Sequence, residues 1–355
     1  MIYVPKLYNL EAECKALDSQ DFSDNIIPLV LFVIDQKRSN SSKSIFDDFE
    51  NLICRKSNNL FFVSIPQNLP LTKKKLKATV SRFYTSQKSD KNAYIDLIKR
   101  FSVYQNVIPT LEVEYGSYAL GMLSALKSSI SSRSDSYAYY VKASSLSIIK
   151  NELFDIITDK DYLIYDLDKK GFHQSSILNE IKEIQNMKKI KHFKSVVIKQ
   201  VYSELTFSKY PDGKILPGTE AYDCIDLDFY SDFKKYEFEG FGDCCGIRDI
   251  PIYRGGGLSY PSYLTIELDT FDHHGFKGIA SEPNSFVNTL LPIYLASDHW
   301  NKILTPTHKA HCGGCQMINS IYLKKERGNN ASKWKTITVS HFIESMDYKL
   351  SNYII

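Results

Sequence analysis

Residues 162–168 read Tyr-Leu-Ile-Tyr-Asp-Leu-Asp, a short apolar run that ends at acidic residues. Seven more runs of this kind occur along the chain: Ile26–Ile34, Leu60–Ile65, Val107–Tyr115, Tyr137–Ala143, Ser195–Val201, Tyr222–Phe229 and Tyr263–Asp269. Short apolar runs bounded by polar residues are typical of buried β-strands. The sequence therefore predicts eight strands.

Longer segments with helical character separate these runs. The clearest is Ser175–Lys189, in which Ile177, Leu178, Ile181 and Ile184 recur at three- and four-residue steps. Strands that alternate with helices indicate parallel pairing, because parallel neighbours need a long crossover connection. We therefore predict an α/β fold, a (β/α)8 TIM-barrel-like unit over residues 1–271, with an open doubly wound sheet as the alternative. Residues 272–355 are expected to form a C-terminal extension of mixed structure that packs on the barrel.

The predicted strands carry charged residues in a regular position. Side chains two residues apart point to the same face of a strand, so in four of the runs an acidic pair shares one face and apolar residues occupy the other. In a barrel the apolar face should meet the helices, which leaves the charged face inside, near the carboxyl ends of the strands. The residues expected at this mouth are Glu112, Glu114, Lys142, Asp166, Asp168, Lys199, Asp226, Asp228, Glu267 and Asp269.

Two interpretations of these charges remain open. Active sites of TIM barrels lie at the carboxyl ends of the strands, and oxygen ligands there could hold Mg²⁺ or Ca²⁺ for phosphodiester cleavage. Alternatively, the carboxylates meet solvent and form an internal ion-pair network with the lysines, since unpaired buried charges cost several kcal/mol each. No pair has a spacing that identifies a catalytic acid and base.

The stretch His308-Lys-Ala-His311-Cys312-Gly-Gly-Cys315 offers four nitrogen and sulfur donors within eight residues. Such donors suit a zinc ion, so a divalent metal, Mg²⁺ at the mouth or Zn²⁺ here, is a possible cofactor; none is certain from the sequence. Structural zinc sites usually draw ligands from two separate segments, and four ligands from one octet would be strained. A glycine-rich loop with small buried thiols is the competing interpretation.

Composition limits the classes of function. The 355 residues include 44 Lys+Arg and 41 Asp+Glu, a formal charge of +3, which argues against a nucleic-acid-binding protein. Residues 1–5 show no charged region followed by an apolar stretch, so neither a signal peptide nor a membrane location is expected. The seven cysteines are odd in number and scattered, and no disulfide framework is predicted. We expect a cytoplasmic protein.

Several short motifs resemble a known family. Tyr3-Val4-Pro5-Lys6-Leu7, Ile26-Ile27-Pro28-Leu29, Val107-Ile108-Pro109, Gly242-Asp243-Cys244-Cys245-Gly246-Ile247 and the stretch from Trp334 to His341 are similar to the Beta family proteins of phages and bacteria. The middle motif of that family is closer to Gly-Asp-Tyr-Gly, and its last motif carries a pair of histidines. The resemblance marks Asp243, Trp334 and His341 as candidate site residues.

The resemblance implies a component of a phage-defence or immunity cassette, with a toxin or effector encoded nearby as its protein partner. On this view the chain neutralises or regulates the effector by direct binding and is not an enzyme. The 13% aromatic content, with 24 Tyr, suits a protein interface. The alternatives are a metal-dependent phosphodiesterase or nuclease at the barrel mouth, and a module that binds a nucleotide or nucleic acid.

Overall fold

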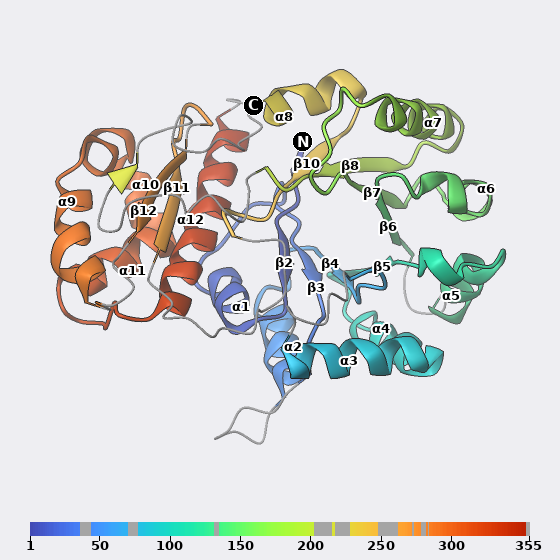
Figure 1. Cartoon of the computed structure of the whole chain (residues 1–355), viewed down its shortest axis with the longest axis horizontal. Coiled ribbons are helices and arrows are strands. Elements are labelled where there is room, and N and C mark those ends of the chain that lie inside the picture. The colour runs from blue at the N-terminus through green and yellow to red at the C-terminus, as the bar shows by residue number, and fades with distance from the viewer. Residues whose placement is uncertain are drawn as a thin grey trace.

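The computed structural model describes residues 1–35, 44–69, 77–130, 135–201, 215–216, 228–247, 262–271, 273–277, 282 and 284–352. A parallel sheet surrounded by helices forms one part of the molecule, and a mostly helical part with a small antiparallel sheet lies beside it (Figure 1). Among the described residues, no helix has both the length and the apolar character needed to cross a membrane.

The large sheet has nine strands in the order β1-β10-β8-β7-β6-β5-β4-β3-β2, and neighbouring strands pair in parallel. The strands are short, and the sheet is curled in the manner of a TIM-barrel-like fold (Figure 1). Their bounds are Ile2–Tyr3 (β1), Lys6–Tyr8 (β2), Leu29–Leu31 (β3), Phe61–Ser64 (β4), Val107–Leu111 (β5), Ala138–Lys142 (β6), Tyr162–Asp166 (β7), Lys194–Ile198 (β8) and Gly240–Gly242 (β10).

The two strands at the ends of this order belong to one short segment of chain, Ile2–Tyr8, which is divided at Val4-Pro5. On one side of the segment, the amides of Val4 and Lys6 donate to the carbonyls of Phe241 and Asp243, both at 2.8 Å. On the other side, the amide of Leu29 donates to the carbonyl of Pro5 at 2.9 Å. The same segment therefore pairs with both β10 and β3.

Helices connect the strands and cover the outside of the sheet. α2 begins with a capping box, in which the Ser44 side chain accepts from the amide of Asp47 and the Asp47 carboxylate accepts from the amide of Ser44. The helices are α1 (Glu11–Asp18), α2 (Ile45–Arg55), α3 (Ala78–Ser89), α4 (Lys91–Phe101), α5 (Met122–Ile130), α6 (Leu146–Ile156), α7 (Ser175–Lys191) and α8 (Asp228–Asp232), with 3-10 turns η1 (Tyr115–Ser117) and η4 (Phe233–Tyr236).

Two hydrophobic clusters confirm the predicted alternation along β7. Tyr162 and Ile164 pack with apolar residues of the neighbouring strands, which forms the inner core. Leu163 and Tyr165 belong to a second cluster that includes Ile177 of helix α7. In β5 the same rule holds, because Ile108 lies in the inner cluster and Leu111 in the outer one. The acidic residues on the inner parity, Glu112 and Asp166, are thereby directed into the sheet's interior.

The C-terminal part has a core of its own around Trp334, whose side chain is fully buried. Its antiparallel sheet has the order β11-β12-β9, and the long helix α12 packs both on β11 and on α1 of the N-terminal part (Figure 1). The elements are β9 (Ile215–Leu216), β11 (Ser262–Ile266), β12 (His273–Lys277), α9 (Leu291–Leu295), α10 (Pro306–His311), α11 (Gly313–Tyr322) and α12 (Ala331–Ser351), with π-helical turns η5 (Phe286–Leu290) and η6 (His299–Ile303).

Six of the eight predicted runs overlap strands of the parallel sheet, and the α/β class is confirmed. A strand within Tyr263–Asp269 is confirmed, but its assignment to the parallel barrel was wrong: β11 pairs antiparallel with β12. For Tyr222–Phe229, residues 222–227 lie outside the described residues, and Asp228 and Phe229 begin helix α8. The sequence pattern missed Ile2–Tyr8, which a proline interrupts, and β10, whose sequence is Gly-Phe-Gly.

Gly242 tests how closely β10 approaches the N-terminal segment. A Cβ at this position would lie 2.1 Å from the Val4 carbonyl oxygen, so Gly242→Ala must push the N-terminal segment away from β10. We expect a loss of about 1–3 kcal/mol in the free energy of unfolding, measured with urea. Gly116→Ala is the control, because a Cβ there meets open space. Equal stability of the two variants would contradict this tight contact.

Candidate functional site

Four buried side chains of the C-terminal part converge at one point. His308, Cys312, Cys315 and His341 each offer a nitrogen or sulfur atom, and these atoms all lie within 4.8 Å of one another. His308 comes from α10, Cys312 and Cys315 from the start of α11, and His341 from the middle of α12. Two thiols and two imidazoles in this arrangement can bind a metal ion.

The turn between α10 and α11 places the first three donors. Thr305 caps α10 by accepting from the amide of His308 at 3.0 Å, and the amide of Cys312 donates to the His308 carbonyl at 2.8 Å. Cys312 then caps α11, where its sulfur accepts from the amide of Cys315 at 3.4 Å. The end of one helix and the start of the next therefore direct the three side chains to the same side.

The two glycines between the cysteines allow this turn to approach other helices closely. A Cβ on Gly314 would lie 2.6 Å from the Ile337 carbonyl oxygen of α12, and a Cβ on Gly313 would lie 2.9 Å from Ser19 Oγ, just after α1. Larger residues would push α11 away from α12 and from His341. The Gly-Gly pair is thus required by packing at the cluster.

His341 lies at the centre of the cluster. Its Nδ1 is 3.4 Å from His308 Nε2, 3.8 Å from Cys312 Sγ and 3.9 Å from Cys315 Sγ. Its Nε2 is within hydrogen-bonding distance of Thr265 Oγ1 on β11. A partner on the far nitrogen fixes the ring and leaves the near nitrogen for a metal, as is usual for histidine ligands.

The electrostatics of the cluster favour a thiolate at Cys312 next to a neutral imidazole at His341. Burial opposes ionisation of Cys312, but hydrogen bonds with Cys315, His308 and His341 outweigh it and hold the pKa of this thiol well below its ordinary value. Burial lowers the pKa of His341, whereas burial and the neighbouring Cys312 raise the pKa of Cys315. A thiolate and a neutral imidazole are the forms that bind metal ions.

The predicted octet therefore supplies three of the four donors. His311 is exposed at the end of α10 and lies outside the group, and His341, 26 residues beyond Cys315, takes its place. The expected strain is avoided because the fourth donor comes from another helix, and structural zinc sites usually draw their ligands from separate segments. The resemblance to the Beta family had marked His341 as a candidate site residue, but its position in the sequence gave no link to the two cysteines.

Two of the charged residues predicted at the strand ends, Asp166 and Glu112, are buried and have hydrogen-bond partners within the protein. Asp166 is buried, accepts from Lys6 Nζ at 2.6 Å and from the hydroxyl of Tyr140, and its other oxygen accepts from the amide of Asp168 at 2.8 Å. Glu112 is also buried. Its two oxygens accept from the amide of Gln67 at 2.8 Å and from Asn68 Nδ2 at 2.7 Å.

The surroundings shift the pKa values of these two carboxyl groups in opposite directions. Burial alone would raise the pKa of Asp166, but the charges of Lys6 and Lys142 and the hydrogen bonds from Lys6 and Tyr140 hold it below its usual value. Burial dominates at Glu112 and raises its pKa. Lys142 is connected to the same network, since its Nζ donates to the Asn68 carbonyl at 3.0 Å. Lys6 was missed because its strand was not recognised, and Tyr140, which lies in a predicted strand, was missed because only charged residues were considered.

The other predicted mouth residues take different positions. Glu114 pairs with Lys88 of α3, Asp168 and Asp228 are exposed, and Lys199 is buried directly after β8. Asp226 lies outside the described residues. The placement of Glu267 and Asp269 at the barrel mouth was wrong, because both follow β11 of the antiparallel sheet.

Asp243 and Trp334, marked by the resemblance, are both buried. Asp243 accepts from the hydroxyls of Tyr3 and Tyr230 at 2.6 Å and from the amide of Cys245 at 2.7 Å. Burial raises the pKa of Asp243, although these hydrogen bonds oppose the rise. Trp334 Nε1 donates to the Gly328 carbonyl at 2.6 Å within the C-terminal core. Both positions therefore hold backbone segments together.

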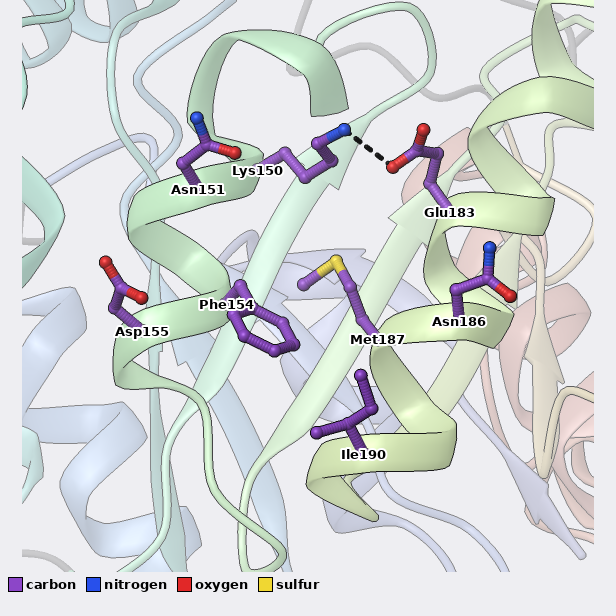
Figure 2. Close-up of a pocket in the computed structure, with 8 residues that line it drawn as sticks. All are labelled: Lys150, Asn151, Phe154, Asp155, Glu183, Asn186, Met187 and Ile190. Carbon is purple, nitrogen blue, oxygen red and sulfur yellow. Dashed lines mark ion pairs between the residues drawn. The ribbon is translucent and has the colours of Figure 1, made fainter.

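A pocket of about 340 Å³ lies on the surface between α6 and α7 (Figure 2). Phe154, Met187 and Ile190 form its apolar lining, and the side chain of Ile190 is 64% exposed. The ion pair between Lys150 and Glu183, 2.7 Å long, crosses one end (Figure 2). Asn151, Asp155 and Asn186 complete the rim.

Comparisons of the chain with family models, with curated proteins and with solved structures found no match.

The ability of the four side chains to bind a metal ion can be tested directly. We expect the purified protein to retain one tightly bound metal ion after dialysis, and Cys312→Ser or Cys315→Ser to weaken that binding at least about 100-fold, since even partners of metal ligands contribute 10–100-fold. His311→Ala, which changes an exposed histidine of α10, should retain the ion. Elemental analysis measures the metal content. Equal loss in all three variants would contradict the assignment of His341 over His311.

The Lys6–Asp166 pair makes a prediction about stability. Lys6→Met should cost about 3–5 kcal/mol in urea unfolding, because it leaves a buried carboxylate without its cation. Lys6→Met/Asp166→Leu should recover much of this loss. Lys15→Met, which removes an exposed pair with Glu11, is the control and should cost less than about 1 kcal/mol. A double variant no more stable than Lys6→Met would show that the pair does not act as a unit.

Proposed function

We propose that this chain is a non-enzymatic binding component of a phage-immunity cassette, which neutralises or regulates a toxic effector protein encoded nearby by direct contact. The observation that supports a binding role is that the buried carboxylates at the strand ends already have hydrogen-bond partners within the protein. Both oxygens of Asp166 and both oxygens of Glu112 accept hydrogen bonds from protein groups. A general base or a ligand for Mg²⁺ needs an oxygen that can reach a proton or an ion. The cassette setting rests on the resemblance to the Beta family.

We further infer that the ion held by His308, Cys312, Cys315 and His341 is Zn²⁺ with a structural role. Two sulfur and two nitrogen donors form a frequent set for structural zinc, and four protein ligands leave no position for a substrate or water. The ion would tie α10 and α11 to α12. None of the six cysteines that the structure describes forms a disulfide, and zinc-bound thiolates suit the reducing cytoplasm proposed for this chain.

A closed barrel would give this binding protein a rigid scaffold. The segment Ile2–Tyr8 pairs with β10 on one side and with β3 on the other, which supports closure of the sheet into a (β/α)8 barrel. The helices of such a barrel hold fixed positions relative to one another. Grooves between neighbouring helices are then preformed, and a partner binds without first ordering them.

The pocket between α6 and α7 is the proposed contact surface, and its occupant would be an amphipathic helix of the effector. Two parallel walls with an apolar floor match the helix-in-groove mode of recognition. Phe154, Met187 and Ile190 would receive the apolar face of that helix, while the exposed carboxylate of Asp155 suits a basic residue at its edge. The exposed amides of Asn151 and Asn186 add polar contacts at the rim.

The proposed contact predicts that a charge placed in the pocket weakens binding of the effector. In a complex with the product of the neighbouring toxic gene, Ile190→Asp should weaken binding at least about 30-fold, because a charge at a central apolar contact costs 2 kcal/mol or more. Ile148→Asp is the matched control, since Ile148 is 42% exposed on α6 but does not line the pocket. Calorimetry measures affinity, and cell growth measures neutralisation. Equal affinities of both variants and the unaltered protein would contradict the proposed surface.

The second candidate function is a metal-dependent phosphodiesterase or nuclease at the mouth of the barrel. The observation that favours it is position, because Glu112 directly follows β5 and Asp166 ends β7, at the strand ends where TIM-barrel enzymes keep their reactive groups. For this function, a hydrogen bond or ion pair of Glu112 or Asp166 would have to break when substrate binds. The existing contacts of both carboxylates therefore favour the binding role.

A further inference from the structure

A second group of metal-ligating side chains lies next to the Cys–His cluster. Glu267, His274 and His299 each offer an oxygen or nitrogen atom, and these atoms lie within 4.8 Å of one another. We propose that these three residues form a second metal site, which binds Zn²⁺ through three protein ligands and leaves one coordination position open. Two imidazoles and one carboxylate are the ligand set of several open zinc sites.

The antiparallel hairpin positions two of the three ligands. In the register of β11 and β12, Thr265 pairs with His274, so Glu267, two residues beyond Thr265, lies near the start of β12. His274 Nε2 is 2.8 Å from Glu267 Oε1. Both side chains are partly exposed, His274 at 16% and Glu267 at 17%. Water can therefore reach the proposed site from this side.

His299 supplies the third ligand from the turn η6. Its ring centre lies 5.0 Å from that of His274. His299 is 5% exposed, and its Nε2 lies 3.1 Å from Thr265 Oγ1. Among the residues that the structure describes, none forms a hydrogen bond with its Nδ1. A buried ring nitrogen is costly without a partner, and a metal ion bound at Nδ1 would satisfy it.

Thr265 connects the second site to the first. Its hydroxyl oxygen lies between His299 Nε2 and His341 Nε2, so the same side chain orients one histidine of each group. A Zn²⁺ bound by two thiolates and two neutral imidazoles carries no net charge. A second divalent ion nearby therefore meets little repulsion from the first. The second site should bind more weakly, since it has one ligand fewer and no thiolate.

Cobalt distinguishes the two sites in the full-length protein. Apoprotein prepared under reducing conditions is titrated with Co²⁺, whose thiolate complexes show an intense charge-transfer band. We expect two equivalents to bind: the first with the thiolate band, the second with weak visible absorption only. Glu267→Gln and His274→Ala should lower the affinity for the second equivalent at least about 100-fold and leave the first unchanged.

Matched controls are Asp269→Asn and His311→Ala, which change an exposed carboxylate after β11 and an exposed histidine of α10. Both should bind two equivalents like the unaltered protein. The thiolate band of the first equivalent reports that each variant has folded. Binding of a single equivalent by the unaltered protein, or an unchanged second equivalent in Glu267→Gln and His274→Ala, would overturn the proposal. Neither result depends on the partner proposed for the chain.

Discussion

The backbone hydrogen bonds on both sides of Ile2–Tyr8 are the constraint on which the rest of the structure depends. This segment lies between β10 and β3, although β10 is more than 230 residues away in the sequence. Its position brings Lys6 to Asp166 and Tyr3 to Asp243, so two buried carboxyl groups obtain their partners from the N-terminal segment. Removal of the segment would therefore expose backbone on two strands and take one hydrogen-bond partner from each of these buried acids.

The same segment determines where the C-terminal part sits. It leads directly into α1, which packs along α12, and Lys335 of α12 pairs with the buried Glu13 of α1 at 2.6 Å. Ser19 comes just after α1, and its hydroxyl oxygen lies 3.1 Å from that of Ser340, the residue before His341. The cluster of His308, Cys312, Cys315 and His341 is thus assembled on a helix that the N-terminal part already holds. Gly313 adds to this arrangement, since it allows α11 to approach Ser19.

The sequence predicts the parts of the fold that depend on local periodicity. Runs such as Tyr162–Asp168 alternate between an inner and an outer core because the period of a strand is two, and the structure shows this alternation in β5 and β7. The pattern fails where a strand is too short to show a period. Gly240–Gly242 owes its place to close approach of the backbone, and Ile2–Tyr8 is interrupted by Pro5. In contrast, β11 has a perfect strand pattern, but periodicity says nothing about which sheet a strand joins.

In the candidate site too, residues close in the sequence could be predicted, whereas residues brought together only by tertiary packing could not. Spacing identifies His308, Cys312 and Cys315 because they share one helix–helix turn. Spacing cannot identify His341, His274 or His299, since their meeting depends on the packing of α12 and the hairpin around Thr265. These residues surround a small core, and most of its polar groups are buried. A core of this size would gain stability from metal ions that link its histidines and thiols. Among the described residues, both groups that can ligate a metal ion lie in the C-terminal part rather than in the larger parallel sheet.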